Sequence, residues 1–242
     1  MISVGPGYPG VRRPFGVVAS TEEVLADPAA DPGVLNPLEQ ARAARFRRDR
    51  DRNDFVAAHL LVRRCAARLL EIPPAEVEFV QHCADCSIPG HGRPGVAGRP
   101  EVSLSLSHTT GVVAAAAGFT PVAVDVEQLG SRQADPAVLA RVLAPAEEKL
   151  VSAHPDPETA FLRQWVRKEA MIKLGLLELD SLATADLSAL PLDQEPGSLA
   201  HYRTDDLHFT EFHDPRRGVL VAAAGPIPVL LGVSATPFTD LP

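Results

Sequence analysis

The sequence has few of the residues that build extracellular or membrane proteins. Its 242 residues include three cysteines, one tryptophan and two tyrosines. So few cysteines exclude a disulfide framework and are typical of a protein from a reducing compartment. No apolar run reaches the length of a membrane span, and the N-terminal text lacks the apolar core and cleavage pattern of a signal peptide. We therefore expect a cytoplasmic protein that does not insert into membranes.

Positive charge is also scarce. The formal net charge is −8 and the pI about 5.5, which argues against general nucleic-acid binding. The exception is "RAARFRRDRDR", residues 42–52, with six arginines. This segment is either a solvated helix face or a set of cations for phosphates or an acidic partner, because the guanidinium fork pairs with both.

A second CxxC pair is missing as well. Cys83 and Cys86 form a single CxxC, flanked by His82 and His91. These residues could bind zinc, but a structural zinc site normally draws on a second spaced ligand pair. The sequence therefore favours a loop of free thiols over a metal site. A Gly-rich phosphate loop of the P-loop type is not found either.

The remaining text alternates between helical and strand patterns, which predicts an α+β fold. Asn36 and Pro37 are typical of a helix start, and Pro73 and Pro74 end the helical pattern that begins at 54. The glycine- and proline-rich stretch 81–100 predicts a loop. The other predictions are strands within 15–20, 102–127, 208–214 and 218–234, helices over 145–154 and 157–176, and a loop over 181–198.

The sequence of the predicted strands repeats at a distance of 107 residues. Segment 112–127 agrees with segment 219–234 at eight of sixteen positions, an agreement that Ala/Val-rich text can also reach by chance. If the repeat is real, the chain consists of two similar α+β halves. We expect an N-terminal half at 1–118 and a C-terminal half at 119–242, together forming one unit.

Two carboxylates end a strand that is otherwise apolar, "PVAVDVEQ" (121–128). Asp125 and Glu127 point to the same face of this strand, and like charges side by side require a cation or a shared proton. The repeat has Gly232 and Ser234 at the matching positions, so the strand packs without carboxylates there. The acidic pair therefore predicts a site between the halves.

The segment "WVRKEAMIKLG" (165–175) predicts a helix with Trp165, Glu169 and Lys173 along one face. By itself this pattern fits a surface helix with a Glu–Lys pair and a buried tryptophan. Together with Asp125 and Glu127, however, Glu169 would complete three oxygen ligands suited to Mg²⁺, and Lys173 could stabilise charge on a phosphate.

In "LSLSHTTG" (104–111), His108 could donate a hydrogen bond to a phosphate, although a lone histidine is more often structural. A nucleophilic pair of Ser107 and His108 is disfavoured, because adjacent strand residues point to opposite faces.

Four motifs in order resemble those of 4′-phosphopantetheinyl transferases of the longer, Sfp-type class: "HGRP" (91–94), "LSLSHTTG" (104–111), "VAVDVE" (122–127) and "WVRKEAMIKLGLLEL" (165–179). The resemblance implies two α+β halves related by pseudo-twofold symmetry, with coenzyme A and Mg²⁺ in the cleft between them. It also implies transfer of the phosphopantetheine arm from coenzyme A to a serine of an apo acyl or peptidyl carrier protein, releasing adenosine 3′,5′-bisphosphate.

Carried over residue by residue, the resemblance implies Asp125, Glu127 and Glu169 as Mg²⁺ ligands, with Mn²⁺ as the alternative ion. Glu169 is then also the base for the carrier serine, and Lys173 contacts the phosphates and aids the leaving group. The positions implied to bind coenzyme A, besides Lys173, are Arg42, Arg52, Arg93, Ser107 and His108.

The chain departs from the family pattern at Leu104 and Ser105, Ala123 and Val166. These departures spare every implied ligand, so they bear on substrate fit and packing more than on catalysis.

Two other hypotheses stay open: another Mg²⁺-dependent phosphoryl or nucleotidyl transferase, and a module that binds coenzyme A or a carrier without chemistry. The carrier, its pathway and the arginines of 42–52 that touch the 3′-phosphate are also left open. Because a doubled chain builds its own cleft, we expect a monomer.

Overall fold

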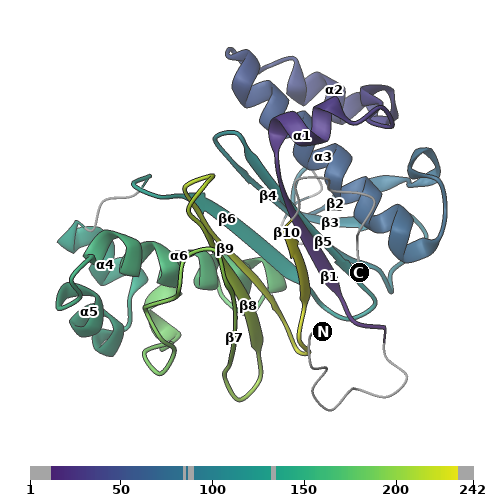
Figure 1. Ribbon diagram of the computed structural model, residues 1–242. Helices are drawn as coiled ribbons and strands as arrows, with labels where there is room; N and C mark the ends of the chain where they lie inside the picture. Colours follow the sequence, from purple (N-terminus) through teal and green to yellow (C-terminus); the bar gives the residue numbers. More distant parts are fainter. Residues whose placement is uncertain (1–11, 84–85, 87–89, 132–134, 234–242) are drawn as a thin grey trace.

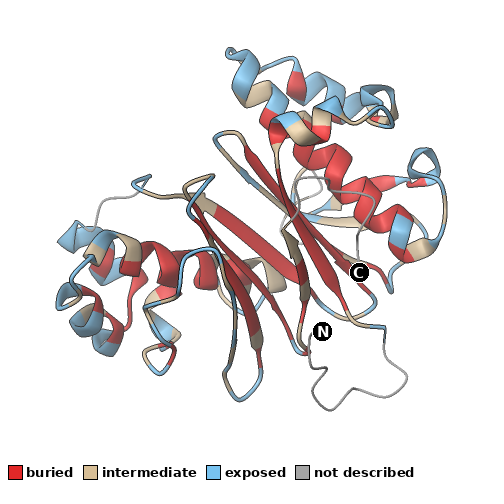
Figure 2. Ribbon diagram, viewed as in Figure 1, coloured by how far each residue is buried: buried red, intermediate tan, exposed pale blue. Residues whose placement is uncertain are grey.

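The computed structural model describes residues 12–83, 86, 90–131 and 135–233. Two four-stranded sheets lie face to face in the middle of the molecule, with helices on their outer sides (Figure 1). The interior strands and the inward faces of the long helices are buried, whereas the loops and the outer helix faces are exposed (Figure 2). The α+β fold predicted from the sequence pattern is therefore confirmed.

The first sheet has the strand order β10-β1-β5-β4 and is covered by α3, and a separate hairpin pairs β2 with β3. The N-terminal part contains β1 (Phe15–Ser20), α1 (Thr21–Ala26), α2 (Pro37–Ala43), α3 (Asp49–Leu70), β2 (Phe79–His82), β3 (Arg93–Val96), β4 (Ser103–Thr109) and β5 (Val112–Gly118), with short 3₁₀ turns at Pro32–Val34 and Pro74–Glu76.

The second sheet has the order β6-β9-β8-β7 and is covered by α6. The C-terminal part contains β6 (Ala123–Gln128), α4 (Pro136–Val142), α5 (Pro145–Ser152), α6 (Pro157–Leu174), a 3₁₀ turn at Leu182–Thr184, β7 (Leu199–Arg203), β8 (His208–Asp214), β9 (Val219–Gly225) and β10 (Leu230–Val233). The last strand, β10, returns to the first sheet and pairs in parallel with β1.

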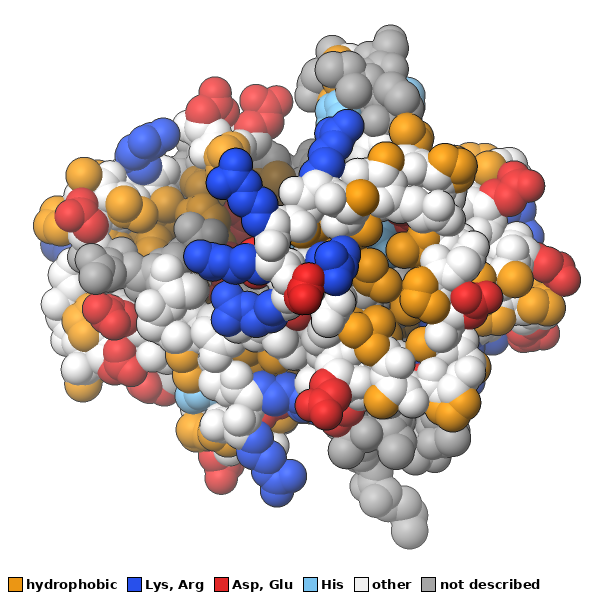
Figure 3. Space-filling view, turned by 90° about the horizontal axis from the view of Figure 1, so that it is seen from above, with side chains coloured by type: hydrophobic (Ala, Val, Ile, Leu, Met, Phe, Trp, Pro, Cys, Tyr) orange, Lys and Arg blue, Asp and Glu red, His pale blue; other side chains and the backbone are white. Residues whose placement is uncertain are grey.

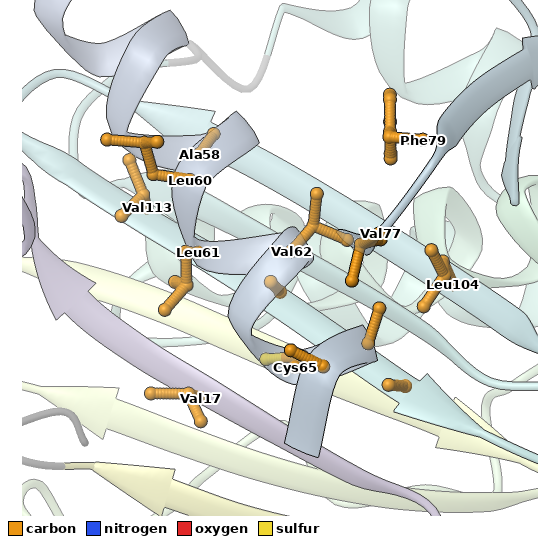
Figure 4. Packing of buried hydrophobic residues seen from close by; sticks show 14 of the residues in the cluster. Val17, Ala58, Leu60, Leu61, Val62, Cys65, Val77, Phe79, Leu104 and Val113 are labelled. Carbon is orange, nitrogen blue, oxygen red and sulfur yellow. The ribbon is translucent and has the colours of Figure 1, made fainter. Parts of the chain in front are cut away.

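Strand β5 shows why small residues fill these sheets. Val113, Ala115 and Ala117 belong to the core under α3, whereas Val112, Ala114 and Ala116 belong to the core between the two sheets. The period of two follows from strand geometry, and packing on both faces leaves room only for small side chains. Figure 4 shows α3 residues, among them Leu61, Val62 and Cys65, packed over this part of the sheet.

Serine hydroxyls connect the two sheets where β4 meets β6. The backbone N–H groups of Val122 and Val124 donate to Ser103 Oγ and Ser105 Oγ at 3.1 and 3.0 Å. Ser105 Oγ also donates to the Val124 carbonyl at 3.4 Å. These side chains satisfy backbone groups that would otherwise be buried without partners, so the alternate serines of "SLSLS" hold the sheets in register.

Most of the predicted elements are present. The helix start at Asn36 is confirmed, because its side chain caps α2 and Pro37 is the first helical residue. The loop predicted over 81–100 is wrong in part, because β2 and β3 form a hairpin across it, paired from Phe79↔Val96 to His82↔Arg93. The sequence patterns do not predict helix α4 or strand β7; both are short, and their patterns are weak.

Candidate active site

A cleft of about 1160 Å³ opens between the β2–β3 hairpin and strand β4 on one side and strand β6 and helix α6 on the other. Seven of the nine predicted site residues line it: Arg42, Arg93, Ser107, His108, Asp125, Glu169 and Lys173. The other two, Arg52 and Glu127, are not among the described residues that line the cleft. The fold therefore gathers into one cavity residues that lie up to 131 positions apart in the chain.

Asp125 and Lys173 form the central contact of the cleft. Lys173 Nζ donates to Asp125 Oδ1 at 2.7 Å and to the Val124 carbonyl at 2.9 Å. Ser107 Oγ donates to the same Asp125 Oδ1, also at 2.7 Å. Residues from β4, β6 and α6 therefore meet at one carboxylate oxygen.

The positions of the other two carboxylates, Glu127 and Glu169, follow from the strand and helix periods. Glu127 lies two residues beyond Asp125 on the same face of β6, and its Oε1 accepts a hydrogen bond from Trp165 Nε1 at 3.1 Å. Lys173 lies about two helical turns after Trp165. It contacts Asp125, which precedes Glu127 by two residues on the same face of β6. The contacts of Trp165 and Lys173 therefore place one face of α6 against the carboxylate face of β6, and Glu169 lies between these two residues in the helix.

The donor set fits a hard divalent cation. Asp125 Oδ2 is buried and has no hydrogen-bond partner among the described residues, whereas Oδ1 accepts two hydrogen bonds. A buried carboxylate oxygen without a donor is costly unless a cation satisfies it. Within the described part of the chain, Asp125, Glu127 and Glu169 do not form a group whose ligand atoms all lie within 4.8 Å of one another, so closing around an ion requires side-chain rearrangement.

Cations approach the cleft from both sides, and Lys and Arg side chains gather over the middle of the molecule seen from above (Figure 3). Arg93, at the start of β3, reaches the end of α6: a Cβ built on Gly175 would lie 2.2 Å from its guanidinium. Arg42, in the last turn of α2, lies over the Phe55 ring at 5.4 Å. Arg52 instead pairs with Asp49 at 2.8 Å along α3, as expected of a solvated helix face.

His108 lies at the mouth of the cleft with its side chain open to solvent. The surrounding walls nevertheless exclude enough water to lower the pKa of its imidazole, and the nearby cations Lys173 and Arg42 lower it further, against the opposing effect of Asp54. His108 is therefore favoured as a neutral hydrogen-bonding group, which suits contact with a polar ligand.

The role of Lys168, next to Glu169 in α6, is not predicted by the sequence pattern. Its Nζ is fully buried and donates to Glu147 and to three backbone carbonyls, those of Val142, Leu182 and Ala185. Lys168 thus fixes α6 to the segments behind it, while Glu169 and Lys173 face the cleft. A charged residue in the middle of a buried helix pattern was the available signal.

The cleft wall also includes Gln81 and Arg99, which no motif indicated, and His82, which the sequence indicated only as a neighbour of the CxxC pair. They lie on or beside the β2–β3 hairpin, which was not predicted because its sequence is rich in glycine and proline.

These features define a class of site: a large cleft with the carboxylates of Asp125 and Glu169 on one wall and cations on both walls. Such a site suits a phosphorylated ligand held through a divalent cation. None of the described helices is long and apolar enough to cross a membrane.

Comparison with known proteins is in keeping with this class. Residues 121–224 match the family model of the 4′-phosphopantetheinyl transferase superfamily. A 4′-phosphopantetheinyl transferase of Bacillus subtilis is 26% identical over 151 residues, covering 60% of this chain and 63% of that protein. The 4′-phosphopantetheinyl transferase psf-1 of Bacillus pumilus is 28% identical over 138 residues, covering 56% and 55%.

The aligned region thus spans less than two thirds of either relative. Segment 121–224 is therefore similar to the 4′-phosphopantetheinyl transferase superfamily, and the resemblance predicted from the sequence motifs is confirmed.

Proposed function

We propose that the protein is a Mg²⁺-dependent phosphopantetheinyl transferase that moves the 4′-phosphopantetheine arm of coenzyme A onto a serine of an apo acyl or peptidyl carrier protein. The observation that carries this proposal is the buried Asp125 carboxylate inside the cleft, with Lys173 on one oxygen and the other oxygen without a partner among the described residues. The cleft volume of about 1160 Å³ is large enough for a ligand of nucleotide size and more.

The reaction breaks one phosphorus–oxygen bond and forms another. The carrier serine oxygen attacks the phosphorus that bears the pantetheine arm, and adenosine 3′,5′-bisphosphate leaves with the electron pair of the broken bond. Glu169 accepts the serine proton, and Lys173 stabilises charge on the phosphates. Arg42 and Arg93 pair with phosphate oxygens, and Ser107 and His108 donate hydrogen bonds to the nucleotide part of the ligand.

Asp125, Glu127 and Glu169 would hold the metal ion, with Mn²⁺ as the alternative to Mg²⁺. When bound, the ion supplies positive charge that offsets the charge of the pyrophosphate. The donor set supports this assignment because it consists of carboxylates, which hard cations prefer, and because Asp125 Oδ2 has no other partner in the described part of the chain. Arg52 remains a proposed contact for the 3′-phosphate from outside the cleft lining.

We also propose that the two halves, 1–118 and 119–242, are related by pseudo-twofold symmetry as one catalytic unit. Strands β5 and β9 begin 107 residues apart, and so do β6 and β10, in agreement with the repeat in the sequence. The β4–β5 hairpin is followed by β6, which pairs with β9 of the second sheet. The β8–β9 hairpin is followed by β10, which pairs with β1 of the first sheet. A chain that builds its cleft in this way acts as a monomer, and we propose a cytoplasmic location and carriers of secondary-metabolite or fatty-acid assembly.

The test is the intact mass of apo carrier proteins incubated with the protein, coenzyme A and Mg²⁺, with EDTA as the control. A mass gain of one phosphopantetheine arm that EDTA prevents is the expected result. Coenzyme A binding without any mass gain across acyl and peptidyl carriers would favour the binding-module hypothesis. Nucleotide turnover without a carrier would favour a different phosphoryl transferase.

A further inference from the structure

A second set of metal-ligand side chains lies at the end of the β2–β3 hairpin, apart from the carboxylates. The ligand atoms of Cys83, Cys86 and His91 all lie within 4.8 Å of one another, and Cys86 Sγ is 3.0 Å from His91 Nε2. All three residues are partly buried. Within the described residues, this is the one group of three or more potential ligands gathered so closely.

The hairpin brings these ligands together. His82 pairs with Arg93 across the two strands, so Cys83 directly follows β2 and His91 comes two residues before β3. Gly92 closes the end tightly: its φ is +94°, and a Cβ there would lie 2.3 Å from the His82 carbonyl oxygen. The close approach of the two strand ends, which only glycine permits, brings Cys83 and His91 near each other.

We propose that Cys83, Cys86 and His91 bind one Zn²⁺ ion that fixes the hairpin end. Two thiolates and one imidazole select zinc over Mg²⁺, which prefers oxygen ligands. Tetrahedral coordination separates a thiolate sulfur from an imidazole nitrogen by about 3.5 Å, so the observed 3.0 Å contact opens only slightly on binding. The ion replaces the protons of both thiols, and two protons are released for each zinc bound. A water molecule completes the coordination.

The ion has a structural consequence for the cleft. The hairpin is a separate two-stranded sheet that is anchored in the core under α3 by Phe79 and Val96, and zinc bound across its far end stabilises that end. Gln81, His82 and Arg93 project from this hairpin into the cleft wall. The zinc site therefore orders one wall of the cleft, while the carboxylates of β6 and α6 form the other.

The first measurement is elemental analysis of the full-length protein purified without chelator. We expect about one zinc per chain in the wild type and in Cys65→Ser, whose thiol is buried in the core under α3. The variants Cys83→Ser, Cys86→Ser and His91→Asn should each lose most of the zinc. Zinc content that is absent from the wild type, or unchanged in a Cys83→Ser/Cys86→Ser double variant, would overturn the proposal, as would loss of two hydrogens in an intact mass that maps to a Cys83–Cys86 disulfide.

Two further measurements use only the wild-type protein, so their outcome does not depend on whether the variants fold. Loading Co²⁺ into chelator-treated wild-type protein should produce thiolate-to-cobalt charge-transfer absorption and the intense visible bands of tetrahedral cobalt. Hydrogen exchange of residues 79–96 should slow on adding Zn²⁺ to the chelator-treated protein and should not change on adding Mg²⁺. Exchange that is insensitive to zinc would contradict the role in ordering the hairpin. None of these results depends on transferase activity, so the zinc site and the proposed function are tested separately.

Discussion

Lys173 Nζ on helix α6 and Asp125 Oδ1 on strand β6 are 2.7 Å apart, with side chains that are 25% and 6% exposed, respectively. The pair lies on the wall of the cleft, so the lysine both neutralises a buried carboxylate and presents its charge to a ligand. Because Ser107 of β4 donates to the same oxygen, one carboxylate connects three elements of the site. This arrangement makes the geometry of the cleft sensitive to single substitutions.

If the proposed function holds, Asp125→Asn should reduce transfer to a carrier by on the order of 10²-fold or more, because the proposed metal ion would lose a charged ligand. The substituted amide keeps the size of the side chain, so we expect the far-UV circular dichroism spectrum to stay unchanged. Initial rates of carrier modification at several Mg²⁺ concentrations measure the effect. The exposed Glu158→Gln in the first turn of α6 is the control and should behave as the wild type. Full activity of Asp125→Asn would remove Asp125 from the metal site.

The two lysines of α6 should separate function from stability. Lys173→Met should lose activity and should lower the free energy of unfolding less than Lys168→Met does, because the Lys173 side chain is partly exposed whereas that of Lys168 is fully buried. Lys168→Met leaves the buried Glu147 carboxylate without its cation and should destabilise the protein by about 3–5 kcal/mol. Urea unfolding and carrier modification, measured on both variants, test this contrast. Equal destabilisation by the two substitutions would contradict it.

Acid should destabilise the region beneath the cleft through Glu39. Burial alone would raise the pKa of this carboxyl, but hydrogen bonds from His59 and Arg63 lower it from 4.5 to about 2. A depressed pKa in the folded state contributes stability that is present above pH 4.5 and is lost as the pH falls toward 2. Between pH 4.5 and about 3, the free energy of unfolding should fall by about 2 kcal/mol from this group.

Urea unfolding across this pH range, on the wild type and on Glu39→Gln, measures the contribution. The variant should be less stable at pH 7, because Arg63 loses its charged partner, and its stability should depend less steeply on pH below 4.5. The exposed Glu195→Gln serves as the control. Parallel pH profiles for the wild type and Glu39→Gln would show that Glu39 does not carry the effect.

Ser105→Ala should weaken the connection between the sheets. Its hydroxyl accepts a hydrogen bond from the backbone N–H of Val124, which would be buried without that partner, whereas the Val124 carbonyl keeps its hydrogen bond from Lys173. We expect a loss of about 1–3 kcal/mol in the free energy of unfolding, with little change in its dependence on urea concentration. Ser152→Ala, at the exposed end of α5, should change stability by less than about 0.5 kcal/mol. A Ser105→Ala variant as stable as the wild type would mean that water replaces the hydroxyl.

Local patterns predicted the elements on which the site stands. Alternation placed Asp125 and Glu127 on one face of β6, and the helical period aligned Trp165 with Lys173 on α6. Both follow from backbone geometry, which repeats every two residues in a strand and every 3.6 in a helix. The β2–β3 hairpin escaped prediction because its pairing is non-local and its text is rich in glycine and proline.

The sequence by itself determined most of the element types, the repeat of 107 residues and the set of chemical groups available to the site. Only the tertiary structure decided which of these groups share a cleft. It directed the side chain of Lys168 from α6 away from the cleft and that of Lys173 toward it. It also paired Arg52 with Asp49 outside the cleft lining. It also gathered Cys83, Cys86 and His91 at one hairpin end. Spacing along a chain fixes which face of an element a side chain occupies, but the packing of distant elements fixes what that face meets.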